Sequence, residues 1–134
     1  MSGRGAVVAV AVRYWAAVFA VGFVLGTVRT LWLAPRLGVL PAVLAELPPM
    51  LTASWLVARR LLARRPLVSR GAALQAGALA FLLLLASEAA LAVWGLGQSP
   101  TQWTRALAAP AGLAGVAGQI GFAVIPGMAW RRPG

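Results

Sequence analysis

Two glutamates, Glu46 and Glu88, are the side chains of this sequence that could do acid–base or cation-binding chemistry. They are the only acidic residues among 134, and each interrupts a long apolar stretch. An ionised carboxylate in the hydrocarbon core of a bilayer is costly unless it is neutralised, paired or hydrated. Two carboxylates placed there therefore need partners, and intramembrane acids of this kind often mark a functional site.

Other polar residues are predicted to lie near these carboxylates. With about 1.5 Å of rise per helical residue, each glutamate lies about 12 Å from the outer end of its apolar stretch. Long arginine side chains could reach them from that end, and a glutamine in the last stretch could add an amide donor. The interpretation stays open between a structural ion-pair or hydrogen-bond cluster and a protonatable or ligand-binding site. The predicted intramembrane polar cluster consists of Arg29, Arg36, Glu46, Glu88 and Gln119.

Composition excludes most other chemistry. All 12 basic residues are arginine, and the chain contains no His, Cys or Asp. A zinc site, a disulfide, a Cys or Ser–His nucleophile and His-ligated haem are therefore excluded. We expect no metal, no cofactor and no catalytic residue. An intramembrane enzyme with Glu46 or Glu88 as general base would lack a second catalytic group, so we expect the protein not to be an enzyme.

Four apolar stretches must position the cluster. The chain is 61% hydrophobic and only 10% charged, against about 25% charged residues in soluble domains. Each stretch is close to the roughly 20 residues that cross a bilayer, and its backbone must be helical because lipid offers no hydrogen-bond partners. The prediction is an all-α membrane protein, one integral domain over residues 1–134 with four transmembrane helices in a bundle. The predicted spans are residues 6–28, 38–58, 71–96 and 107–130.

Arginine placement predicts the orientation. Eight arginines flank one side of the spans and three flank the other, so the positive-inside rule places both termini in the cytoplasm. Arg13 interrupts the first span, which we therefore expect to be a retained anchor rather than a signal peptide. The net charge of +10 is expected to meet anionic lipid and not nucleic acid. The predicted headgroup contacts are Arg59, Arg60, Arg64, Arg65 and Arg70.

Prolines and glycines predict how the helices bend and pack. Pro48 and Pro49 fall inside the second span, where they remove two backbone donors and predict a kink beside Glu46. Small residues at regular spacing let helices approach closely. They indicate packing within the bundle or a dimer seam. The glycines concerned are Gly22 and Gly26 in the first span and Gly112, Gly115, Gly118 and Gly121 in the fourth.

Several segments resemble a group of small bacterial inner-membrane proteins that have four predicted helices and no assigned activity. The resemblance covers most of the chain and implies a multi-pass protein of the bacterial inner membrane. It implies nothing about activity, but it groups Arg29, Arg36, Glu46 and Glu88 in the matching segments. Those segments are residues 22–29 (GFVLGTVR), 35–38 (PRLG), 45–48 (AELP) with Met50, and 86–88 (ASE) with Trp94.

Two functions remain as alternatives. The first is an accessory or scaffold component of the membrane, because the chain has no catalytic constellation and almost no loop outside the spans. The second is a small proton-linked transporter or channel that works as an oligomer through Glu46 and Glu88. Four helices with a membrane glutamate are similar to the small multidrug resistance family, whose key glutamate is in its first helix, where this chain has none. A homo-oligomer and a membrane-protein partner are both compatible with these alternatives.

Overall fold

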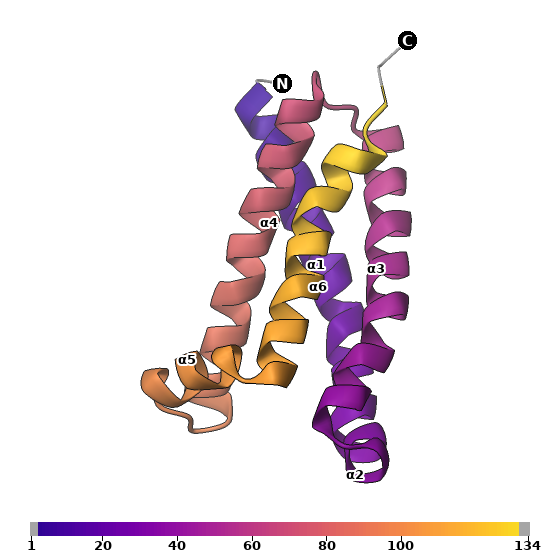
Figure 1. Cartoon of the computed structure of the whole chain (residues 1–134). Coiled ribbons are helices and arrows are strands. Elements are labelled where there is room, and N and C mark those ends of the chain that lie inside the picture. The colour runs from indigo at the N-terminus through magenta and orange to yellow at the C-terminus, as the bar shows by residue number, and fades with distance from the viewer. Residues whose placement is uncertain (1–2, 132–134) are drawn as a thin grey trace.

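The computed structural model describes residues 3–131, and every regular element of that part of the chain is helical (Figure 1). Four helical stretches are long and apolar enough to cross a membrane: Gly3–Leu37, Val39–Arg64, Arg70–Gly95 and Pro110–Ala129. The predicted all-α fold with four such helices is confirmed. In chain order the elements are α1 (Gly3–Val28), η1 (Arg29–Leu33), α2 (Ala34–Leu37), α3 (Val39–Arg64), α4 (Arg70–Ala90), η2 (Leu91–Gly95), α5 (Pro100–Ala108) and α6 (Pro110–Ala129).

The first helix extends well past the predicted span. It continues from α1 through the π-helical segment η1 and α2, and ends at Gly38, whose φ of 91° suits glycine because it has no Cβ. The amide of Gly38 donates to the carbonyl of Ala34 and so closes the last turn. The prediction ended this span at residue 28 because the polar Arg29 and Thr30 follow. The backbone nevertheless remains helical there, and Arg29 pairs with Glu46 of α3.

A short helix, α5, was missed in the sequence. Its first residue is Pro100, and its start is closed by a capping box in which Ser99 and Gln102 each accept a backbone N–H from the other. Ala109 is extended, as residues before proline usually are, and Pro110 begins α6. The fourth apolar helix therefore begins at residue 110, and residues 107 and 108 belong to α5.

The four long helices form an antiparallel bundle in which α1 and α6 lie diagonally opposite each other (Figure 1). Each of these two packs against both α3 and α4. We use two names for the ends of the bundle. The terminal end contains the start of α1, the end of α3, the start of α4 and the end of α6. The distal end contains η1, α2, η2 and α5 (Figure 1).

Small residues bring these helices close together. A Cβ on Gly77 of α4 would overlap the backbone of Ala123 in α6, and one on Gly118 of α6 would overlap Leu47 of α3. Gly22 of α1 makes a tight contact without overlap, since a Cβ there would lie 3.2 Å from Cε of Met50 in α3. The interpretation of the predicted glycines as packing residues is therefore confirmed for Gly22 and Gly118, whereas a Cβ on Gly115 would meet nothing within 4 Å.

Candidate functional site

An ion pair joins α1 to α3 near the distal end. Nε of Arg29, the first residue of η1, lies 2.8 Å from Oε2 of Glu46 on α3. The Glu46 side chain is 14% exposed and that of Arg29 is 33% exposed. Gly26, one turn before the arginine, lies beside the pair, since a Cβ there would be in ordinary contact with both side chains, 3.5 Å from Nη2 of Arg29 and 4.0 Å from Oε1 of Glu46. The contact is ionic and not a well-aligned hydrogen bond.

A second polar pair joins α4 to α6. Nε2 of Gln119 lies 2.7 Å from both carboxylate oxygens of Glu88 and donates to them. Oε1 of the same glutamine is buried and accepts no hydrogen bond within residues 3–131. Glu88 also interacts electrostatically with Arg29 and Glu46. Four of the five predicted residues are thus brought together, one from each long helix, and Arg29, Glu46, Glu88 and Gln119 are named the polar cluster from here on.

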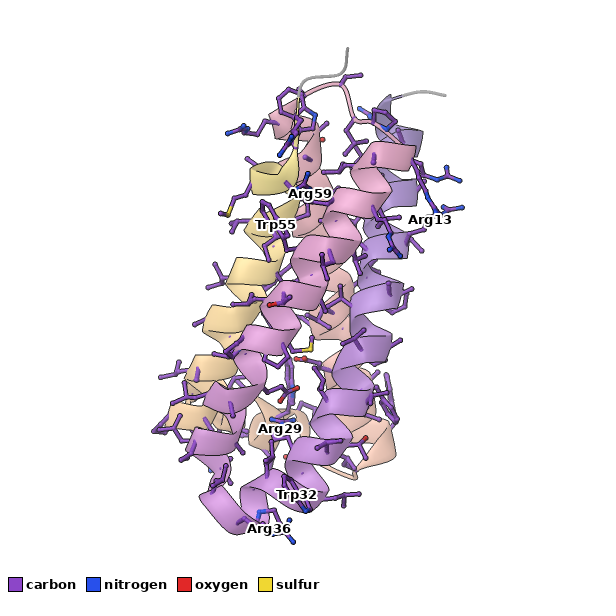
Figure 2. All side chains as sticks on the ribbon, turned by 90° about the vertical axis from the view of Figure 1, so that its right-hand side faces the viewer. Arg13, Arg29, Trp32, Arg36, Trp55 and Arg59 are labelled. Atoms are coloured by element: carbon purple, nitrogen blue, oxygen red, sulfur yellow. The ribbon has the colours of Figure 1, made fainter. Side chains whose placement is uncertain are left out.

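Arg36 does not join the polar cluster, which corrects the prediction. Its guanidinium lies over the ring of Trp32, 4.5 Å from the ring centroid, at the distal tip of the molecule (Figure 2). The prediction placed Arg36 in a loop that could fold back toward the glutamates. The chain instead stays helical from Arg29 to Leu37, so seven residues carry Arg36 about 10 Å further along the axis.

The polar cluster lies beside two π-helical turns. Arg29 is the first residue of η1, and Glu88 lies three residues before η2 on α4. The amide of Leu91 contacts the carbonyls of both Ser87 and Glu88, where the hydrogen-bond pattern changes. Turns of this kind are rare and occur frequently at functional sites. The spacing of apolar residues gave no sign of either one.

The two prolines beside Glu46 lie inside one continuous helix. The helix α3 runs through Pro48 and Pro49 without a break. Neither proline has an N–H, so the carbonyls of Leu44 and Ala45 lose their usual helical donors, and both of these residues are exposed. The predicted kink stays a prediction.

Tyr14 makes a buried hydrogen bond that the sequence analysis did not anticipate. Its hydroxyl donates to the carbonyl of Phe122 at 2.6 Å, and the two rings are stacked with centroids 4.3 Å apart. Pro126, four residues after Phe122, cannot donate to that carbonyl. The hydroxyl therefore replaces the missing helical donor and ties α1 to α6 across the bundle. The signal available in the sequence was Pro126 itself, because a proline inside a helix leaves the carbonyl four residues earlier in need of another donor.

A related contact joins α1 to α4. The indole Nε1 of Trp15 donates to Oγ of Ser87 at 3.0 Å, and Ser87 donates to the carbonyl of Leu83 at 2.7 Å. Ser87 directly precedes Glu88, so this contact fixes the position of α4 next to the polar cluster.

The predicted headgroup arginines gather at the terminal end. All five are exposed, at the end of α3, just after it and at the first residue of α4. Figure 2 shows Arg59 near that end of α3, with Arg13 exposed on α1. Headgroup contact by Arg59, Arg60, Arg64, Arg65 and Arg70 stays a prediction.

The fold and the site define an all-helical protein whose four long helices enclose a charged cluster and are apolar enough to cross a membrane. Among residues 3–131 no group of three or more His, Cys, Asp or Glu side chains could hold a metal ion. Comparisons with protein-family models, with curated proteins and with solved structures found no match.

Proposed function

We propose that the chain is a multi-pass protein of the bacterial inner membrane with both termini in the cytoplasm. The apolar helices support membrane insertion. The excess of arginines at the terminal end supports the orientation.

The orientation is tested by single-cysteine labelling, which the absence of natural cysteines permits. Val68→Cys probes the α3–α4 loop, and Thr101→Cys probes α5. A membrane-impermeant maleimide is expected to label Thr101→Cys in intact spheroplasts and Val68→Cys only after lysis. The reverse pattern would overturn the proposed orientation, and a mixture of both patterns would indicate dual topology.

We further propose that the protein is a non-enzymatic accessory or scaffold component of that membrane. The observation that carries this proposal is the pairing of its intramembrane polar side chains with one another across the helices. Such closed pairs fix the register of a bundle. The Ser87 hydroxyl next to Glu88 is likewise engaged, with Trp15 and with the carbonyl of Leu83.

The accessory role predicts a stoichiometric membrane-protein partner. Mild-detergent purification of the full chain from its own membranes should retain that partner, which cross-linking and mass spectrometry would identify. A monodisperse species that contains only this chain, from membranes cross-linked before extraction, would contradict the accessory role.

A proton-linked transporter or channel is the second candidate, and the charge of the polar cluster favours it. With both carboxylates ionised, one guanidinium faces two negative charges, and the buried Oε1 of Gln119 still lacks a donor. A proton or a small cation would balance the excess negative charge and would also interact with the buried Oε1 of Gln119. Purified protein in proteoliposomes under a pH gradient would then show proton flux that Glu88→Gln abolishes. Equal flux with wild type, with Glu88→Gln and with empty vesicles would exclude this candidate.

A further inference from the structure

The arginines at the terminal end have no acidic side chain of this chain to neutralise them. The only two carboxylate side chains of the sequence are Glu46 and Glu88, and both belong to the polar cluster near the other end. No acidic side chain of this chain is therefore available to balance the positive charges of the terminal end. We name six of these residues the basic rim: Arg59, Arg60, Arg64, Arg65, Arg70 and Arg131.

The basic rim lies where lipid headgroups would be. The helix α3 has 26 residues, and at 1.5 Å per residue it is about 39 Å long. The hydrocarbon core of a bilayer is about 30 Å thick. The surplus of about 9 Å corresponds to roughly six helical residues. Residues 59–64 at the end of α3 are six residues.

A hollow with arginines on two of its sides opens within the basic rim. Arg59 contributes from α3, and Arg131 contributes from the residues just after α6. Its volume is about 130 Å³, well above the roughly 10–15 Å³ that a cavity needs to hold one water molecule. Its remaining lining is mostly apolar and consists of Leu62, Ala63, Pro66, Leu67, Ala129 and Trp130.

Specific contacts hold the walls of this hollow in place. The indole Nε1 of Trp130 donates to the carbonyl of Leu67 at 2.9 Å, and the Leu67 side chain is only 2% exposed. The guanidinium of Arg70 lies 5.8 Å from the Trp130 ring centroid. The loop after α3 and the end of α6 are thus fixed against each other. The backbone that carries Arg59 and Arg131 is therefore held in place on both sides of the hollow.

We infer that this hollow binds the phosphate of an anionic phospholipid headgroup. Guanidinium groups bind phosphate oxygens through paired, charge-assisted hydrogen bonds. The apolar walls suit the glycerol and first acyl carbons that follow a lipid phosphate, and free phosphate has no such part. The inference rests on the proposed membrane placement and is independent of the accessory role.

The test is lipid binding to the full chain in detergent, measured by native mass spectrometry as phosphatidylglycerol or phosphatidylcholine is added. The pocket variant is Arg59→Gln with Arg131→Gln. The matched control is Arg4→Gln with Arg13→Gln, which removes the same charge from exposed residues that neither line the hollow nor belong to the basic rim. We expect wild type and control to bind the first phosphatidylglycerol alike and to prefer it to phosphatidylcholine. Binding to the pocket variant should be weaker by roughly tenfold or more, because charge-assisted hydrogen bonds to the phosphate are lost.

A second variant tests the shape of the hollow with its charge intact. Ala63→Leu fills the space that Ala63 lines and is expected to weaken phosphatidylglycerol binding while every arginine remains. Unchanged binding in Ala63→Leu, or an equal loss in the Arg4/Arg13 control, would overturn the inference in favour of general charge attraction. Inorganic phosphate that displaces the lipid at equal concentration would overturn the lipid as ligand. Cysteine labelling reports the membrane placement separately. A wrong membrane placement can therefore be distinguished from a failure of the hollow to bind lipid.

Discussion

Arginine side chains have opposite environments at the two ends of the bundle. Near the distal end, Arg29 is two-thirds covered and forms an ion pair with Glu46 inside the polar cluster. At the terminal end, the basic rim is exposed, and the chain provides no carboxylate side chain beside it. Composition alone cannot separate the two roles. What separates them is depth, because a charge within the apolar layer needs a partner from the protein, whereas a charge at its edge meets water and lipid phosphate.

The largest effect is expected at the ion pair. Arg29→Gln should lower the free energy of unfolding by about 2 kcal/mol, below the range for a fully buried pair because the arginine is partly exposed. Arg29→Gln combined with Glu46→Gln should recover most of that loss, since no carboxylate is then left unpaired. The measurement is a double-mutant cycle of unfolding by SDS in mixed micelles.

Arg36→Gln is the matched control for that cycle. It removes the same charge near the same end, but its guanidinium stacks on Trp32 and faces no acid. Its expected cost is about 0.5 kcal/mol. A neutral or stabilising Glu46→Gln would contradict a structural pair, because wild type would then retain an unfavourable carboxylate, and the proton-linked alternative would gain support.

The second pair of the polar cluster should give the next largest effect. Gln119→Leu removes the amide that donates to both oxygens of Glu88, its one hydrogen-bond donor among residues 3–131, and is expected to cost about 1.5 kcal/mol. Glu88→Gln keeps an amide opposite Gln119 and removes the excess negative charge, so it should be neutral or stabilising. Unfolding curves of the two variants side by side would decide this. A loss in Glu88→Gln as large as in Gln119→Leu would show that the cluster requires the ionised carboxylate.

Tyr14→Phe sharpens the comparison with a neutral buried contact. It keeps the stacked ring but leaves the carbonyl of Phe122 without its donor, at an expected cost of about 1 kcal/mol. In a Pro126→Ala background the helix regains an N–H for that carbonyl, so Tyr14→Phe should cost less there. The same cost in both backgrounds would mean that the hydroxyl does not compensate for the proline.

Sequence reasoning succeeded where one physical constraint dominates. Long apolar runs can only be helices in lipid, so the four long helices were predictable, and intramembrane charges need partners, so Arg29, Glu46, Glu88 and Gln119 could be grouped. It failed where backbone geometry decides. Arg36 was assigned to the cluster because a loop was assumed, whereas the chain stays helical to Leu37 and carries Arg36 outward. The partner of Tyr14 depends on a proline in another helix, and the π-helical turns have no pattern of their own.

The smallest expected effect has the opposite sign and lies in the basic rim. Arg60 and Arg64 are four residues apart on α3, and like charges at that spacing destabilise a helix by about 0.3 kcal/mol. Arg60→Gln should therefore raise the free energy of unfolding slightly in neutral detergent, whereas Arg29→Gln lowers it. In micelles that contain phosphatidylglycerol the anionic headgroups screen the repulsion, so the gain should disappear. A loss in neutral detergent comparable to that of Arg29→Gln would mean that Arg60 has a partner within the protein, and the contrast between the two ends would then fail.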